Sequence, residues 1–195
     1  NMTNLRHVEF PSGATAGKTD FNRMFAVNTK LKNLPFFDTS SATNVENIFG
    51  NCHSIETVPE YDFSNVDNFG HIFHRCLSLK KIPEIDFSNG KNFQHAFSYN
   101  HSLLNMPSGF SLVSATGANS TFLYNFNMTY LPELDCPNLT DARYMFSECR
   151  SLRSVTVNFP SANNVDSTFY ICPSLEKLTI KSIGGNPTSF YRFIR

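Results

Sequence analysis

Cysteine and histidine, the side chains that most often hold metals or act as nucleophiles, are both present in this chain. It has five cysteines and six histidines: Cys52, Cys76, Cys136, Cys149, Cys172, His7, His53, His71, His74, His95 and His101. No C-x-x-C pair occurs, and no Cys and His set has the spacing of a zinc site. The odd number of cysteines argues against a disulfide framework. We therefore expect buried free thiols, histidines without a ligand role, and no metal or cofactor.

Carboxylates and hydroxyls are the other groups that could carry chemistry. An Asp recurs at Asp38, Asp62, Asp86 and Asp135, but calcium-binding repeats supply several oxygen ligands per turn, whereas each unit here supplies one. In D-T-S and D-F-S we expect the Asp to accept a hydrogen bond from the backbone N–H two residues on. Ser and Thr have no His and acid at an activating spacing, and nucleophile-elbow and phosphate-loop motifs are missing. We predict a protein that is not an enzyme.

Composition narrows the possible partners. The 195 residues carry 16 Lys plus Arg against 16 Asp plus Glu, so we expect no nucleic-acid partner. No apolar run reaches the roughly 18 residues of a membrane span, so we expect no membrane insertion. The first residues have no signal-peptide core, which implies that any export signal was removed or lies outside this sequence. Phe is unusually frequent, at 20 copies, and Trp is absent.

The elements that must position these groups follow from an internal repeat. A Phe returns every 23 to 25 residues, at Phe25, Phe49, Phe73, Phe97, Phe122, Phe146 and Phe169. Three residues after each Phe stands an Asn or a Cys. Aliphatic residues follow at six and nine, and a Pro comes next in five units: Pro35, Pro59, Pro83, Pro107 and Pro132. Such columns arise when short units stack and share one core.

We predict an α/β solenoid of about seven coils with short parallel strands. Strands are expected at residues 54–59 and 78–83, and helical or 3₁₀ turns before the Phe residues, at 44–49 and 65–73. Pro lacks an N–H donor, so the Pro column should end the strand pairing. An inward Asn amide, or a thiol in its place, should satisfy the backbone of its own and the adjacent coil. We divide the one continuous domain into a first or capping coil (1–33), repeats (34–177) and a partial or capping coil (178–195).

Two consecutive units, IFGNCHSIETVPEYDFSNVDN and IFHRCLSLKKIPEIDFSNGKN, carry a recognisable motif. It resembles the BspA-type, or Treponema-pallidum-type, leucine-rich repeat of bacterial surface proteins and of repeat proteins from bacteriophages. The resemblance covers about residues 8–190. It implies a curved leucine-rich-repeat solenoid that serves as a binding module, extracellular or on a virion. It transfers no ligand, because members share scaffold positions while their exposed positions vary.

The exposed positions beside the predicted strands are where a partner would be recognised. Charges alternate at first along this strand-side face, at Lys32, Glu56 and Lys80. Farther along it, apolar, aromatic and basic residues mix, as they do in protein hot spots and sugar-stacking surfaces. The ligand-binding candidates are Lys80, Lys81, Leu104, Asn105, Thr129, Tyr130 and Arg153.

The sequence thus favours a non-catalytic module that binds a protein or a glycan through the strand-side face. As a bacterial cell-surface, adhesin-like protein it would be extracellular. The alternative is a virion or tail component of a bacteriophage, acting in host-receptor binding or virion assembly. A spacer whose face binds nothing also fits the pattern, and the oligomeric state is left open.

Overall fold

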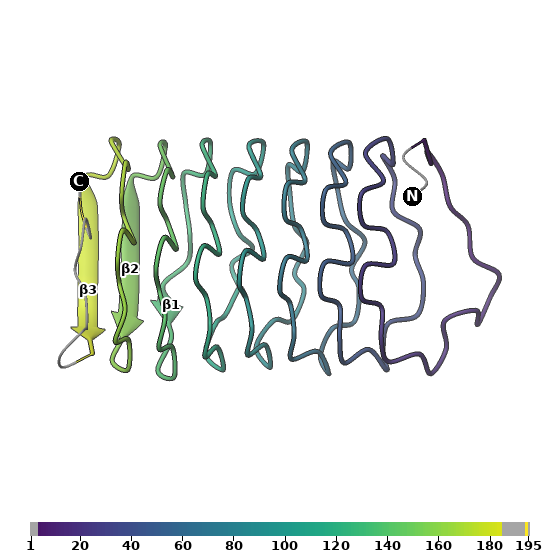
Figure 1. The fold of residues 1–195 in the computed structure, drawn as a ribbon, viewed down its shortest axis with the longest axis horizontal. Coiled ribbons are helices and arrows are strands. Elements are labelled where there is room, and N and C mark those ends of the chain that lie inside the picture. Colours follow the sequence, from purple (N-terminus) through teal and green to yellow (C-terminus); the bar gives the residue numbers. More distant parts are fainter. Residues whose placement is uncertain (1–3, 185–193, 195) are drawn as a thin grey trace.

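The chain winds into a row of coils that lie side by side from one end to the other (Figure 1). The computed structural model describes residues 4–184 and 194. Three strands are present among them, β1 (Leu134–Asp135), β2 (Ser154–Phe159) and β3 (Lys177–Ile183). They form one parallel sheet in the order β1-β2-β3, with Val155 of β2 opposite Leu178 of β3. Parallel pairing of consecutive coils is therefore confirmed.

In the described chain, the longer strands form only in units that lack the Pro of the repeat. The strands expected at 54–59 and 78–83 are wrong, since neither segment is a strand, although the N–H of Lys80 still bonds the carbonyl of Glu56 (3.0 Å). Pro59 and Pro83 end these segments and cannot donate to a ladder. The unit at β2 has Thr156 where others have Pro, and the longer strands β2 and β3 form in the units without that Pro.

The helical or 3₁₀ turns expected before the Phe residues are also wrong. Residues 4–184 contain neither kind of helix. The non-glycine residues with positive φ in the described chain, between 53° and 66°, all stand two residues before or after a Phe of the repeat. His71 and Arg75 flank Phe73 in this way. A left-handed residue cannot continue a right-handed helix, so each segment becomes a series of hydrogen-bonded turns.

These turn segments pair with one another from coil to coil. The N–H groups of Asn47, Phe49 and Asn51 donate to carbonyls of the next coil at 2.8, 3.1 and 2.7 Å. The residues between them donate within their own coil, as Ile48 does to the carbonyl of Val45 at 3.1 Å. Every second N–H therefore links coils, which gives the turn side the parallel ladder that the strand side largely lacks.

The core is a column of stacked Phe rings. All seven repeat Phe residues are buried, at 0–3% exposure. Phe122 and Phe146 lie 5.6 Å apart between ring centroids with 7° between their planes, and Phe146 and Phe169 lie 5.1 Å apart at 10°. At the N-terminal end, Phe10 packs against Phe25 at 6.1 Å. The shared core predicted from the Phe column is confirmed, and the Phe rings themselves stack within it.

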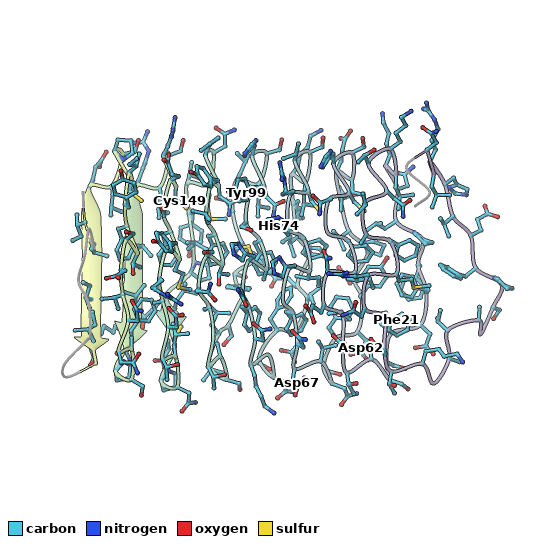
Figure 2. The ribbon with its side chains drawn as sticks, viewed as in Figure 1. Phe21, Asp62, Asp67, His74, Tyr99 and Cys149 are labelled. Carbon is cyan, nitrogen blue, oxygen red and sulfur yellow. The ribbon has the colours of Figure 1, made fainter. Side chains whose placement is uncertain are left out.

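The Asn/Cys column bonds backbone carbonyls inside the core. The Cys149 thiol (Figure 2) donates to the carbonyl of Phe122 in the preceding coil at 3.1 Å, and Cys76 donates likewise to Phe49 at 3.2 Å. Asn100 donates to Phe97 of its own coil at 2.8 Å. Whether the position holds Asn or Cys, its side chain thus donates a hydrogen bond to the backbone carbonyl of a repeat Phe.

The Asp column forms the expected turns. Asp38 and Asp62 accept hydrogen bonds from the backbone N–H of Ser40 and Ser64, both at 3.0 Å. Asp135 differs, because it lies in β1 and accepts from the amide of Asn158 at 2.8 Å. Of the segment proposed as a C-terminal cap, residues 178–184 and 194 are described and the remainder lies outside the described residues. Within the described chain, no helix has the length and apolar character needed to cross a membrane.

Candidate ligand-binding faces

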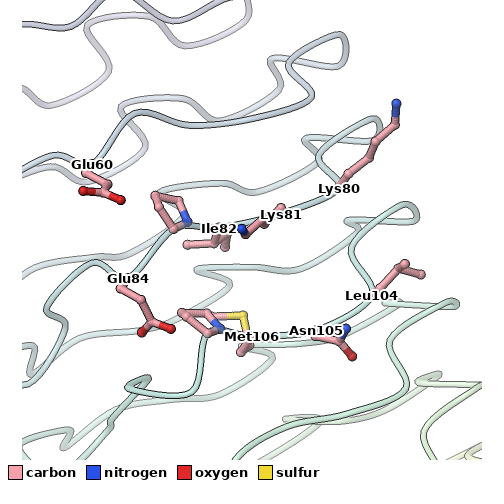
Figure 3. A pocket seen from close by; sticks show the side chains of 10 residues that line it. Glu60, Lys80, Lys81, Ile82, Glu84, Leu104, Asn105 and Met106 are labelled. Atoms are coloured by element: carbon pink, nitrogen blue, oxygen red, sulfur yellow. The ribbon is translucent and has the colours of Figure 1, made fainter.

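Four of the seven candidate residues line one hollow on the strand-side face. Lys80, Lys81, Leu104 and Asn105, from two adjacent coils, border a depression of about 400 Å³. Figure 3 shows Glu60 and Glu84 at one end of it and Lys80 and Leu104 at the other. The floor is apolar, formed by Ile82, Pro83, Met106 and Pro107. A partner lying in it would meet an acidic end, an apolar floor and a basic end.

The charges at this hollow differ in how far they are already engaged. Lys80 Nζ lies 2.6 Å from Glu56 Oε2, and this hydrogen bond and charge lower the pKa of Glu56. Both carboxylate oxygens of Glu84 accept hydrogen bonds from the next coil, from the N–H groups of Ser108 and Gly109 at 3.2 and 3.1 Å. Lys81 has no ion-pair partner within the described part of the chain, so its ammonium group is available to a ligand.

The other three candidates continue the same face over the next coils. Asn105 pairs with Tyr130 as a parallel bridge, and the Thr129 hydroxyl donates to Asn105 Oδ1 at 3.1 Å. Tyr130 and Leu104 are 52% and 51% exposed, which is high for large apolar side chains. Arg153 lies one coil farther, 3.7 Å from Glu176, with both side chains largely exposed. The structure thus places the seven candidates on consecutive coils, with four of them around one hollow.

The opposite, turn-side face carries an aromatic cluster that the sequence analysis did not single out. His71 and His95 stack at 5.0 Å, and the ring of His74 lies edge-on to both at 5.3 and 5.7 Å. Tyr99, labelled with His74 in Figure 2, meets His74 at 5.5 Å. Burial, then the nearby His71 and His95, lowers the pKa of His74 to about 4. Burial also lowers the pKa of His71 and His95, so the neutral form of the three imidazoles is favoured near pH 7.

The aromatic cluster continues along the turn side toward the C-terminal coils. Tyr99 lies 4.7 Å from Tyr124, and Arg150 lies 4.8 Å above the ring of Phe126. A second hollow, of about 270 Å³, follows among three coils and is lined by Ser120, Leu123, Tyr124, Tyr144, Ser147, Glu148 and Tyr170. The residues that line this hollow stand one or two positions before or after a repeat Phe. Counting positions from each Phe, which identified the strand-side candidates, would therefore also have identified these residues from the sequence.

Metal and thiol chemistry receive no support from the geometry. Across residues 4–184 and 194, no group of three or more His, Cys, Asp and Glu side chains is placed to hold a metal ion. All five cysteines are buried free thiols. Burial raises the pKa of Cys76 and Cys149 well above the ordinary value, which keeps these thiols protonated and unreactive.

A stack of parallel-paired, 23–25-residue coils with two hollowed faces defines a repeat protein. The turn segments from Phe25 to Phe122 and the hollow at Lys80 fall within residues 19–130, which match the model of a family described as "Mycoplasma protein of unknown function, DUF285". The chain belongs to this family.

Among solved structures, the chain is similar to a leucine-rich repeat protein from Bacteroides ovatus, with 17% sequence identity and a TM-score of 0.22. That match covers 90% of this chain, and this chain spans 61% of the length of the Bacteroides protein. No curated protein matches the sequence.

Proposed function

We propose that this protein is a BspA-type leucine-rich-repeat solenoid that binds a protein partner through its strand-side face, without catalysis. In this proposal it acts at a bacterial cell surface as an adhesin-like module. The observation that carries the proposal is the hollow of about 400 Å³ lined by Lys80, Lys81, Leu104 and Asn105, with Tyr130 and Arg153 exposed beside it.

The chemistry of this face favours a protein over other partners. Tyr and Arg are enriched in protein hot spots, where an aromatic or guanidinium side chain is desolvated at the centre of a contact. Leu104 and Tyr130 present apolar area there, and Lys81 offers an unpaired charge at the edge. Because the Phe stack and the coil-to-coil hydrogen bonds fix the backbone below, little ordering free energy would be lost on binding.

The test is binding of the whole chain to cells and matrix proteins. The chain would be labelled at its amino terminus, because the thiols are buried and lysines belong to the proposed face. Two panels are compared: a range of bacteria, and animal cells with purified matrix proteins. We expect saturable binding to animal cells or matrix protein. Saturable binding to a narrow set of bacteria alone would instead identify a phage receptor-binding component, and binding to neither panel would leave a spacer or assembly role.

Variants connect binding to the strand-side face. The double substitution Tyr130→Ala with Arg153→Ala removes two exposed side chains and should weaken binding at least tenfold, with an unchanged melting temperature. Phe36→Ala is the matched control, because Phe36 is an exposed aromatic residue, at 74%, that does not line the hollow and belongs to the first coil, four coils before Tyr130. Equal binding by the double variant and the wild type would overturn the assignment of the face.

A further inference from the structure

The hollow of about 270 Å³ on the turn-side face has the composition of a ligand site. It lies among three successive coils, with Tyr124 from the first, Tyr144 from the second and Tyr170 from the third. Tyr144 is 44% exposed, so an aromatic ring is open to solvent at its rim. Aromatic rings beside a few convergent polar groups are the usual lining of a small-molecule site.

Two serines that line this hollow have hydroxyls without a hydrogen-bond partner among the described residues. Ser120 and Ser147 are 4% and 3% exposed, and neither hydroxyl bonds another group in the described residues. Ser98 occupies the same repeat position as Ser147, one residue after the Phe, and its hydroxyl lies 2.7 Å from Nδ1 of His74. The hydroxyls of Ser120 and Ser147 can therefore donate to and accept from a ligand that enters the hollow.

Glu148 adds a fixed acceptor. Its residue is 8% exposed, and both bonds from Arg150, each 2.8 Å long, end on the same oxygen, Oε2. Oε1 has no partner in the part of the chain that the structure describes. Arg150 is itself held over the ring of Phe126. The carboxylate is thus positioned from one side, and its second oxygen stays available to a donor in the hollow.

The charge balance selects the class of ligand. The Glu148 charge is neutralised by Arg150, and the nearby Arg143 is paired with Asp141 at 2.8 Å. Among the described residues, no unpaired charge of either sign lines the hollow, so neither an anion nor a cation gains a partner of opposite charge from them. A neutral pyranose ring matches the remaining groups of the hollow, which are aromatic rings, two hydroxyls and one carboxylate oxygen. Its C–H face packs on an aromatic ring, and its hydroxyls donate to Glu148 Oε1 and exchange hydrogen bonds with the two serines.

We propose that the hollow lined by Tyr124, Tyr144, Tyr170, Ser120, Ser147 and Glu148 is a binding site for a neutral sugar residue. This site is separate from the strand-side face and does not depend on the function proposed for that face. The small volume of about 270 Å³ accommodates one ring.

The test is saturation-transfer NMR on the whole chain with simple probes. These are the methyl glycosides of glucose, galactose, mannose and N-acetylglucosamine, with choline as a cationic probe and methyl glucuronide as an anionic one. We expect saturable binding of at least one neutral glycoside and weaker or no binding of both charged probes. The absence of saturable binding by all four neutral glycosides, or stronger binding of choline or of methyl glucuronide, would overturn the proposal.

Two variants locate the binding. Tyr144→Asn removes the ring and suits the left-handed backbone there (φ 55°), so it should weaken glycoside binding about tenfold. Ser147→Ala removes a hydroxyl that bonds nothing among the described residues, so it should leave stability unchanged and weaken binding about fivefold. Phe36→Ala should bind as the wild type does. If Tyr144→Asn unfolds, Ser147→Ala decides, and full binding by a folded Ser147→Ala protein contradicts the assignment.

Discussion

The side-chain amide of Asn125 donates a hydrogen bond to the backbone carbonyl of Phe97, 2.9 Å away in the preceding coil. The same nitrogen donates to Phe122 of its own coil at 3.0 Å, and Oδ1 accepts from the N–H of Asn100 at 2.9 Å. One buried side chain therefore satisfies three backbone groups in two coils. Because the position recurs in every unit, it fixes how each coil sits on the one before it.

Substituting Asn125 should therefore be costly although no apolar volume is lost. Asn125→Ala leaves the buried N–H of Asn100 without its acceptor and removes one donor each from the carbonyls of Phe97 and Phe122, which keep bonds from Asn100 and Cys149. We expect a loss of about 3 kcal/mol in the free energy of unfolding. Asn125→Cys should lose less, because a thiol fills this position in neighbouring units. Urea denaturation measures both variants, and equal stability of Asn125→Ala and the wild type would contradict the role of the column.

The Phe stack gives a second stability prediction. Phe73 is fully buried between Phe49 and Phe97, at 5.5 and 6.0 Å. Phe73→Ala should lower the free energy of unfolding by about 3–5 kcal/mol because it opens a cavity that the rigid coils cannot close. Phe36→Ala, at an exposed position, should change it by less than about 0.5 kcal/mol. Similar losses in the two variants would show that the stack is not the core.

Thiol reactivity should report folding. Burial raises the pKa of Cys52 and Cys136 to about 12 and that of Cys172 to about 11. At pH 8 the native chain should therefore react with a disulfide reagent such as DTNB only slowly, whereas all five thiols should react at once in denaturant. Rapid reaction of one or more thiols in the folded chain would contradict their placement in the core.

Acidification should destabilise the turn-side histidine cluster. Burial, together with His71 and His95, lowers the pKa of His74 to about 4, below its ordinary value of 6.5. Between these values the unfolded chain binds more protons than the folded one, so stability rises with pH from 4 to 6.5. We expect this group to contribute about 2 kcal/mol over that window, given that solvent reaches part of the ring.

The control for the pH effect comes from the repeat itself. Leu123 occupies the position of His74 two coils later, so His74→Leu should be accepted by the backbone. The melting temperature of this variant should depend less on pH between 4 and 6.5 than that of the wild type. An unchanged pH dependence would mean that other groups, and not His74, account for it.

The repeat made much of the fold predictable. Spacing alone identified the Phe column, and the chemistry of Asn and thiols predicted their bonds to the backbone of adjacent coils. The Pro column was expected to end the strand pairing. In fact the segments 54–59 and 78–83, which end at Pro59 and Pro83, form no strand at all. The helical turns failed for a backbone reason: residues such as His71 and Arg75 adopt positive φ, and nothing in their side chains signals it. Pairing with the next coil imposes that conformation.

By itself the sequence determined the stacking, because the columns of Phe, Asn or Cys, and Pro can be satisfied only when like positions of successive units meet. It also placed Lys80, Lys81, Leu104 and Asn105 on one face. Only the tertiary structure decided which faces are hollow and which polar atoms are left unpaired. Those properties depend on side chains from different coils, as with Glu148 Oε1 and the hydroxyl of Ser147, and no spacing within one unit encodes them.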